Sequence, residues 1–362
     1  MPGETAVKYQ FFEELPGLAD RGLIRKSPHP SLPLDIYNYT VKAQYLPVRE
    51  WTEALKDCRG LILDHQGHIV GRPFRKFWEY QFVLSEVPIT GGETAGATTE
   101  AFHVWEKLDG SLGVVCSFEG RRVSATRGRF DSAQARWLAA YLDREHADFV
   151  PPDGETYLFE IVYPANRLVV DYGDTAEVFL LAVLDKDARD LWPAFDQCSR
   201  FRKARRFDGI SDFSLIDSDP RFAGGEGFVL QWESGMRAKV KLAEYRRLHR
   251  LITELSARTI WEMLRTGQGT SMLVDRVPAD FEHWVQEQIA RIAASHAEIM
   301  KWAREAMQAA PPAEPRSDFA QWVKQQRYPK LLFSLADGRD ITDTVWKMVE
   351  PRGAITFRTE GE

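Results

Sequence analysis

The feature that most constrains the fold of this 362-residue chain is a change of sequence pattern near residue 243. Between about 59 and 242, short runs rich in β-branched and aromatic residues alternate with Gly, Pro and Asn, a pattern typical of antiparallel strands. Beyond 243, apolar residues recur at three- and four-residue spacing, which predicts amphipathic helices. We therefore expect an α+β domain over 1–245 and an all-helical domain over 246–362.

The individual elements follow from the same patterns. Residues 1–50 are expected to extend the first domain. The strands are predicted at 59–64 and 68–74, which form a hairpin, and at 102–108, 111–118, 121–127, 156–164, 167–172, 177–185, 227–234 and 236–242. The helices are predicted at 132–142, 243–267, 281–310, 318–326 and 341–350.

Composition excludes several classes of protein. A hydrophobic fraction of 44% with 12% aromatic residues is too apolar for a disordered chain. No apolar stretch approaches the roughly 18 residues that span a membrane, and residues 1–10 lack the pattern of a signal peptide. The three cysteines have no CxxC spacing, which argues against a disulfide framework or a zinc site and favours a cytoplasmic location. The net charge of −6 excludes a protein that coats nucleic acid by bulk positive charge.

The most informative motif is Lys107-Leu108-Asp109-Gly110, which lies between two predicted strands. The P-loop, HExxH, GxSxG and strand-embedded GxGxxG signatures are absent. A lysine on a loop is usually a solvated charge. A lysine that attacks phosphorus, however, must be a free amine. Its pKa therefore has to be lowered, which neighbouring cations or burial can do. Candidate cations lie on predicted strands or turns of the same domain: Arg59, Lys76, Arg127, Lys239 and Lys241.

Two further patterns each have two interpretations. Lys239 and Lys241 alternate, so their side chains share one face of a strand, which either lines a site or is the solvated face of an edge strand. Glu160 interrupts the apolar strand LFEIV, and Glu226 precedes the strand GFVLQW; a buried carboxylate needs a partner such as a metal ion. Strand alternation could instead turn Glu160 outward, because its two neighbours share the other face.

Seven segments, in their order along the chain, resemble the motifs of the covalent nucleotidyltransferases, the superfamily of nucleic-acid ligases and RNA capping enzymes. They are CRGLILD (58–64), RPFRKFWEY (72–80), EKLDGSL (106–112), TRGRF (126–130), FEIVYPANRLVV (159–170), GEGFVLQW (225–232) and AKVK (238–241). The residues of these segments are most similar to those of the ATP-dependent RNA ligases of the T-even phage type, the RNA ligase 1 family. The resemblance covers about residues 50–250. It implies an ATP-grasp-like nucleotidyltransferase domain of antiparallel sheets with helices, followed by an all-α domain that selects the RNA substrate.

The resemblance also implies a role for each motif residue. Lys107 would attack the α-phosphate of ATP to form a lysyl-AMP adduct, and Gly110 would let the backbone pass close to the nucleotide. A hydrated Mg²⁺, or Mn²⁺ in its place, would be held by three carboxylates: Asp109, Glu160 and Glu226. The phosphates and the nucleotide would be bound by Arg59, Lys76, Trp78, Arg127, Lys239 and Lys241. Arg127 stands where the family usually has lysine, so its planar guanidinium replaces a point donor, and Trp78 stands where phenylalanine is usual.

These roles predict an ATP-dependent RNA ligase that joins 5′-phosphate and 3′-hydroxyl RNA ends through lysyl-AMP and RNA-adenylate intermediates. The family implies RNA repair, with tRNA as the substrate and a separate end-healing kinase/phosphatase as a partner, and no membrane. The alternatives are a DNA ligase, a GTP-dependent capping-type nucleotidyltransferase, or an inactive homologue that only binds nucleotide or RNA.

Basic and aromatic residues outside the motifs have less specific interpretations. Basic clusters at 200–206, expected on a helix, and at 246–250 either contact RNA phosphates or form solvated surfaces paired with acidic neighbours. The tryptophans of the helical domain are expected in its core: Trp261, Trp284, Trp302 and Trp322.

Overall fold

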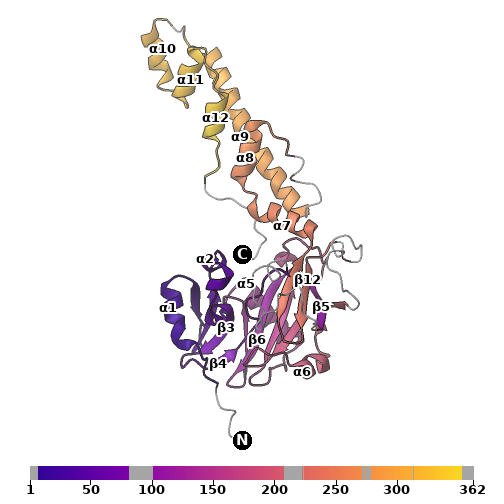
Figure 1. The fold of residues 1–362 in the computed structure, drawn as a ribbon. Helices are drawn as coiled ribbons and strands as arrows, with labels where there is room; N and C mark the ends of the chain where they lie inside the picture. Colours follow the sequence, from indigo (N-terminus) through magenta and orange to yellow (C-terminus); the bar gives the residue numbers. More distant parts are fainter. Residues whose placement is uncertain are drawn as a thin grey trace. The chain divides into compact units, whose positions relative to one another are not determined.

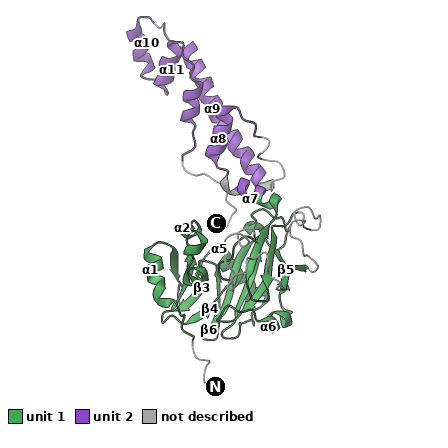
Figure 2. Cartoon of the chain, viewed as in Figure 1, with its two compact units in different colours: residues 1–246, 359–362 green, residues 247–358 purple. Residues whose placement is uncertain are grey.

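A computed structural model describes residues 7–80, 101–207, 222, 224–270, 273, 279–312 and 314–352. The chain divides into two compact units, one of residues 1–246 and 359–362 and one of residues 247–358 (Figure 2). The expected fold class, antiparallel sheets with helices followed by an all-helical part, is confirmed (Figure 1).

The first sheet of the first unit is antiparallel, with the strand order β1-β2-β3-β4. Its strands are β1 (Ile24–Pro28), β2 (Leu34–Tyr39), β3 (Arg59–Asp64) and β4 (Ile69–Gly71). The same part holds α1 (Leu15–Asp20), α2 (Val41–Gln44) and α3 (Glu53–Asp57), with 3₁₀ turns at Phe12–Glu14 and Val48–Glu50. Residues of helices and sheet, such as Leu15, Leu55 and Leu61, form one core. The pairing of β3 with β4 confirms the predicted hairpin.

The second sheet has the order β10-β9-β8-β6-β7 and is covered on both faces. Its strands are β6 (Ser111–Phe118), β7 (Arg121–Thr126), β8 (Thr156–Val162), β9 (Glu177–Leu184) and β10 (Arg202–Lys203). One face packs on the first sheet, since Val114 and Cys116 of β6 share a core with Ile62 of β3. The intervening Val115 points the other way and packs with Leu138 of α5 (Ala133–Glu145).

The third sheet has the order β11-β5-β12-β13 and is also antiparallel. Its strands are β5 (Phe102–Lys107), β11 (Arg206–Phe207), β12 (Gly227–Trp232) and β13 (Arg237–Lys241). Gly227 of β12 lies opposite Lys107 on one side and opposite Lys241 on the other. The sheet therefore brings β5 beside the consecutive strands β12 and β13, which lie far from it in the sequence. Helix α6 (Trp192–Gln197) packs beside the sheet through Trp192 and Trp105.

The second unit is helical. The chain forms α7 (Ala243–Glu254), which starts in the first unit, and then α8 (Ala257–Thr266), α9 (Ala279–Gln308), α10 (Arg316–Val323), α11 (Pro329–Ala336) and α12 (Thr342–Met348). The long α9 packs with α8, α11 and α12 (Figure 1). Ile299 of α9 shares a core with Leu331 of α11 and Val345 of α12.

The tryptophans of the helical part lie in or against its core, as expected. Trp261 is buried and donates a 2.8 Å hydrogen bond from Nε1 to the carbonyl oxygen of Trp346. Trp302 and Trp322 are partly buried against the core around Phe319. No helix among the residues described here is long and apolar enough to cross a membrane.

The structure differs from the predicted elements in three places. The helix expected at 243–267 is two helices, because Ser256 caps a new start by accepting a 3.2 Å hydrogen bond from the amide of Thr259. The basic cluster at 200–206 is not helical but contains the short strands β10 and β11. The strand expected at 167–172 is absent; two of its backbone amides bind a side chain instead of a neighbouring strand.

Candidate active site

Lys107, the last residue of β5, lies against a buried carboxylate. Its Nζ donates a 2.6 Å hydrogen bond to Oε2 of Glu226, whose side chain is 4% exposed. Oε1 of Glu226 lies 3.2 Å from Nζ of Lys241, the last residue of β13. The strand register explains this contact, because Glu226 immediately precedes Gly227, which is opposite both lysines. One buried carboxylate is therefore paired with two lysine side chains.

Two glycines allow the backbones around Lys107 to approach each other closely. A Cβ on Gly227, whose φ is +150°, would lie 2.0 Å from the carbonyl oxygen of Val240. A Cβ on Gly110 would lie 2.4 Å from the carbonyl oxygen of Ile161 and 3.2 Å from Cγ of Glu160. Neither position has room for a side chain. The absence of a side chain at Gly110 is what lets the turn after Lys107 lie directly beside Glu160.

Asp109 organises the turn that follows Lys107. Its Oδ2 accepts hydrogen bonds from the amides of Val169 (2.9 Å) and Val170 (2.8 Å), and its Oδ1 accepts a 2.7 Å bond from the hydroxyl of Tyr245. The amide of Asp109 donates to the hydroxyl oxygen of Tyr172 at 2.8 Å. Both carboxylate oxygens are thus engaged by the chain. Sequence reasoning missed both tyrosines, since neither belongs to a motif and each is more than 60 residues from Asp109.

Glu160 lies on β8 beside this turn. The side chain of Glu160 lies on the same face of the strand as Leu158, which packs between the first and second sheets. The Glu160 side chain therefore does not point out into solvent. Burial raises the pKa of Glu160 to about 8; Lys107 opposes this rise, whereas Glu226 and Asp109 add to it. The Glu160 carboxyl is therefore largely protonated at neutral pH unless a further cation is present.

A second group of cations surrounds Tyr39 at the end of β2. Arg59 hydrogen-bonds to the Tyr39 hydroxyl, and Cζ of Arg127 lies 5.3 Å from the centre of the ring. Nζ of Lys76 lies 5.4 Å from the same ring. Burial works to raise the pKa of Tyr39, but the charges of Arg59, Lys76 and Arg127 outweigh it and lower that pKa. NH1 of Arg59 is buried with no hydrogen-bond partner among the described residues, so the group has donor capacity for an anion.

Lys76 also lies within reach of two tryptophan rings. Its Nζ is 5.3 Å from the ring centre of Trp51 and 5.7 Å from that of Trp78. Burial, Arg59 and Arg127 lower the pKa of Lys76, although Tyr39 opposes them. Tyr39 and Trp51 are further site residues that the motifs did not identify; the short aromatic run at 37–39 was the only signal for the former.

Lys239 connects the two groups. Its amide donates a 3.0 Å hydrogen bond to the carbonyl oxygen of Trp78, which joins β13 to the segment that carries Lys76. Burial and, to a smaller extent, the charges of Lys76, Lys241 and Lys107 together lower the pKa of Lys239 to about 8. Lys239 and Lys241 share a face of β13, as their alternation predicts. Neighbouring groups cover most of this face, so it is not the open face of an edge strand, and Lys241 keeps only 18% of its side chain exposed.

The structure thus brings the predicted cations and carboxylates into one region of the first unit. Within the described residues, however, no three His, Cys, Asp or Glu side chains are grouped so as to hold a metal ion. The oxygens of Asp109 already accept bonds from amides and a tyrosine, and those of Glu226 are paired with lysines. The metal role of these two carboxylates and of Glu160 therefore stays a prediction.

The basic cluster at 200–206 is partly neutralised by acidic neighbours. Arg200 donates to both oxygens of Asp148, at 2.6 and 2.7 Å, and Arg202 lies 3.4 Å from Glu177. These pairs favour the solvated-surface interpretation for those two arginines.

Comparison with known proteins agrees with the motif order. No protein-family model matches the chain. An alignment of 158 positions, which covers 37% of this chain, is 30% identical to the protein named "Putative bifunctional polynucleotide kinase/RNA ligase" from Autographa californica nuclear polyhedrosis virus. Over that part this chain is similar to a protein that is named as an RNA ligase. It spans 22% of the length of that viral relative.

Comparison with solved structures finds partial matches of low identity. An archaeal ATP-dependent RNA ligase matches 79% of each chain with 14% identity and a TM-score of 0.43. A "Putative ATP-dependent DNA ligase" from Aquifex aeolicus matches 77% of this chain and 70% of its own, with 15% identity and a TM-score of 0.41. A Naegleria gruberi RNA ligase variant with ATP and Mn matches 43% of this chain and 53% of its own, with 18% identity and a TM-score of 0.34. None of these four relatives is named as a T-even phage ligase, so that finer assignment stays a prediction.

Proposed function

We propose that this chain is an ATP-dependent RNA ligase whose nucleophile is Lys107. The observation that carries the proposal is the position of this amine: it is paired with a buried carboxylate and faces Lys239 and Lys241, in a chain whose viral relative is named as an RNA ligase. In the first step a bond forms between Nζ and the α-phosphorus of ATP, and the bond to pyrophosphate breaks. AMP is then transferred to a 5′-phosphate RNA end, which a 3′-hydroxyl end attacks with release of AMP.

The ion pair with Glu226 bears directly on the first step. An ammonium group cannot attack phosphorus, so Nζ of Lys107 has to lose its proton and leave its 2.6 Å bond to Oε2 of Glu226 before it reacts. Whatever draws Glu226 away from Lys107 therefore releases the amine for attack.

A divalent cation fits the carboxylates that are available. Burial raises the pKa of the Glu160 carboxyl to about 8, so a cation beside it would stabilise the ionised form of this group. Glu160 and Glu226 offer the oxygen ligands that Mg²⁺ and Mn²⁺ accept through their bound waters. Asp109 would join them only through water or by releasing Tyr245. Bound there, the ion would supply positive charge near the α-phosphate.

The cations around Tyr39 are suited to the triphosphate. NH1 of Arg59 is buried and has no partner within the described part of the chain, and Lys76 and Arg127 lie against the ring of Tyr39. Phosphate oxygens accept bonds from such donors, and nucleotidyl transfer depends mainly on charge neutralisation and positioning. We assign Arg59, Lys76 and Arg127 to the β- and γ-phosphates, and Lys239 and Lys241 to the α-phosphate. Gly110 and Trp78 shape the site around them.

The biological setting is part of the same proposal. We assign RNA-substrate selection to the helical part over 246–362 and take RNA with 5′-phosphate and 3′-hydroxyl ends, tRNA included, as the substrate. The viral relative is named for both a kinase and a ligase activity, and the match covers 22% of it. We therefore propose that a separate end-healing kinase/phosphatase prepares the ends, and that the protein works in the cytoplasm, where its three unpaired cysteines stay reduced.

One assay tests the nucleotide, the nucleophile and the polymer together. The purified chain is incubated with Mg²⁺ and α-labelled ATP or GTP, and then chased with 5′-phosphorylated RNA or DNA. We expect a covalent protein–AMP adduct with ATP alone, and its discharge into a sealed product with RNA. An adduct with GTP would indicate a capping-type enzyme, sealing of DNA alone a DNA ligase, and no adduct a protein that only binds nucleotide or RNA.

A further inference from the structure

We propose that Asp57 is a positioning residue for nucleotide binding, because its buried carboxylate holds the segment 72–78 that carries Lys76 and Trp78. Asp57 is the last residue of α3 and precedes the CRGLILD motif. The inference rests on the proposed function, since it concerns the task of Lys76 in binding the phosphates of ATP.

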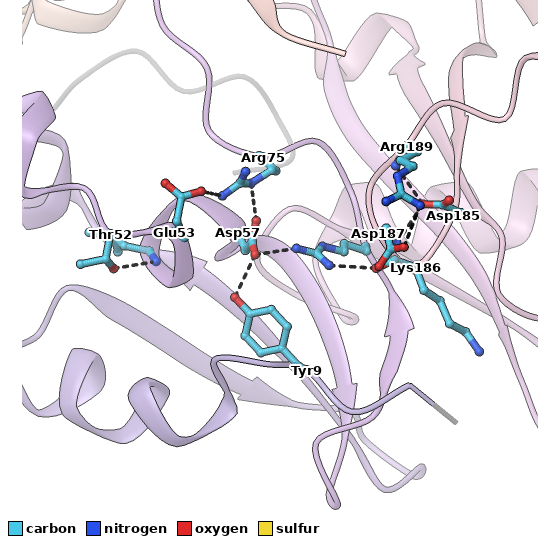
Figure 3. Close-up of polar contacts among 11 residues, drawn as sticks. Tyr9, Thr52, Glu53, Asp57, Arg75, Asp185, Lys186, Asp187 and Arg189 are labelled. Atoms are coloured by element: carbon cyan, nitrogen blue, oxygen red, sulfur yellow. Dashed lines mark hydrogen bonds and ion pairs between the residues drawn. The ribbon is translucent and has the colours of Figure 1, made fainter. Parts of the chain in front are cut away.

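Three donors converge on the Asp57 carboxylate. Oδ2 accepts hydrogen bonds from the hydroxyl of Tyr9 at 3.0 Å and from NH2 of Arg72 at 2.7 Å, and Oδ1 accepts from Nε of Arg75 at 2.6 Å. Figure 3 shows Tyr9 and Arg75 reaching Asp57 from opposite sides, with Glu53 as the outer partner of Arg75. The Asp57 side chain is fully buried, with an exposed fraction of 0%. A carboxylate buried in this way is stabilised by the hydrogen bonds and charges of these donors.

Arg72 extends the network to the second sheet. Its amide donates a 2.9 Å bond to Oγ1 of Thr156 at the start of β8. Its NH1 donates a 2.9 Å bond to the carbonyl oxygen of Lys186, in the turn after β9 that Figure 3 also shows. Asp57 therefore links α3 to the second sheet through one arginine. The start of the segment 72–78 is held between them.

The rest of the segment 72–78 is held by backbone hydrogen bonds close to the candidate site. The amide of Lys76 donates to the carbonyl oxygen of Lys56 at 2.8 Å, and the carbonyl oxygen of Trp78 accepts from Lys239 at 3.0 Å. Between these points the side chain of Lys76 reaches the ring of Tyr39. A displacement of the segment moves Nζ of Lys76 away from Tyr39 and from the triphosphate. Phosphate-binding groups lose most of their effect when they are misplaced by about 1 Å.

A positioning role and a purely structural role predict different outcomes. A buried residue that only supports the fold lowers the stability of the unit without selective effects on one part of the substrate. A residue that positions Lys76 affects the binding of the phosphate tail while it leaves the binding of the nucleoside and α-phosphate unchanged. Tripolyphosphate and AMP separate these two parts of ATP.

The test compares Asp57→Asn with a matched core variant, Leu142→Ala. Leu142 is fully buried in α5, in a core that holds neither Asp57 nor the segment 72–78. Asparagine retains the shape and one acceptor of aspartate but directs an amide donor at the arginines. We expect Asp57→Asn to raise the KM for ATP in lysyl-AMP formation about tenfold and to change the rate at saturating ATP less than about threefold. Tripolyphosphate should become a weaker competitor by the same factor, AMP should be unaffected, and Leu142→Ala should leave all four values unchanged.

A second variant covers the case in which Asp57→Asn does not fold. The Arg75 side chain is 40% exposed, so Arg75→Gln removes one donor at a smaller cost to the fold, and we expect the same changes at smaller size. Unchanged tripolyphosphate competition in these variants, or an equal change in Leu142→Ala, would overturn the inference. Failure of the wild type to form lysyl-AMP overturns the proposed function instead. The binding of tripolyphosphate, measured by calorimetry, still decides the role of Asp57 in that case.

Discussion

The hydroxyl of Tyr245 donates a 2.7 Å hydrogen bond to Oδ1 of Asp109, 136 residues earlier in the chain. Tyr245 lies just beyond the AKVK motif, and Asp109 lies in the turn that follows Lys107. The bond joins the first turn of α7, which follows the third sheet, to the turn after Lys107. Burial and the charges of Glu226 and Asp109 raise the pKa of Tyr245, so its hydroxyl stays protonated and remains a donor.

Tyr245→Phe tests this link. The variant keeps the ring, which lies 5.0 Å from Nζ of Lys241, and removes only the donor. Because a hydrogen bond to a charged acceptor is lost, we expect the free energy of unfolding to fall by about 1–3 kcal/mol and lysyl-AMP formation to slow. Denaturant unfolding and labelled-ATP assays measure the two effects. Tyr45→Phe, at an exposed position, is the control; equal behaviour of the two variants would contradict the prediction.

Lys107→Arg separates charge from nucleophilicity. Arginine retains a cation beside Glu226 but remains protonated and cannot attack phosphorus. We expect Lys107→Arg and Lys107→Ala to yield no covalent AMP by mass spectrometry after incubation with ATP and Mg²⁺. The arginine variant should also retain the wild-type melting temperature. Lys8→Arg, at an exposed lysine, should be adenylated normally. An adduct on either Lys107 variant assigns the nucleophile elsewhere.

Glu226→Ala removes the carboxylate that lies between Lys107 and Lys241. Both lysines are partly exposed, at 23% and 18%, so water can solvate them and we expect the fold to remain intact. Lysyl-AMP formation should nevertheless fall by about 10–100-fold, as for the loss of a metal-site carboxylate. Circular dichroism checks the fold, and a magnesium titration checks the activity. Normal adenylation across that titration would exclude the metal role.

The lowered pKa of Lys239 predicts how the stability of the protein depends on pH. Its pKa is lowered from 10.5 in the unfolded chain to about 8 in the folded protein, chiefly by burial. Between pH 8 and 10.5 the unfolded chain therefore binds a proton that the folded protein has released, and the Lys239 contribution to the free energy of unfolding increases with pH. Below pH 8 both states are protonated and the contribution is constant, at its least favourable. We expect Lys239→Gln to be more stable than the wild type by about 1–3 kcal/mol at pH 7 and to lose this advantage toward pH 10.5.

That prediction is checked by urea unfolding at a series of pH values without metal or nucleotide. Exposed Lys42→Gln is the control, since it should leave the pH dependence unchanged. A Lys239→Gln curve parallel to that of the wild type between pH 8 and 10.5 would show that Lys239 titrates normally.

Gly110→Ala tests the close approach of the turn to β8. The added Cβ would lie 2.4 Å from the carbonyl oxygen of Ile161, so the turn or the strand has to shift. We expect a loss of lysyl-AMP formation of about 100-fold or more, because such a shift misplaces Lys107 relative to Glu226. The matched control is Gly17→Ala in α1, where the Cβ meets no atom within 4 Å. Adenylation of Gly110→Ala at the rate of Gly17→Ala would refute the steric argument.

Much of the first unit could be predicted because strand patterns are local. The β3–β4 hairpin and the strands around Lys107 follow from alternation and turn residues, which depend only on neighbours in the sequence. The failures have tertiary causes. Residues 167–172 read as a strand, but the amides of Val169 and Val170 bind the Asp109 side chain. The cluster at 200–206 read as a helix, but β10 pairs with β9 and β11 with β5.

For the candidate site, the amino-acid sequence already identifies which chemical groups are present and in what order. The seven motifs contain the lysine, the carboxylates and the cations, and side-chain alternation placed Lys239 and Lys241 on one face. It could not determine partners, since a contact between distant residues depends on sheet register and not on local spacing. Only the tertiary structure decided that Glu226 lies between Lys107 and Lys241, that Tyr39 gathers Arg59, Lys76 and Arg127, and that Asp57 holds the segment of Lys76. In each case the physical reason is the same: a charge taken out of water requires a partner, and folding alone determines which residue is near enough to be that partner.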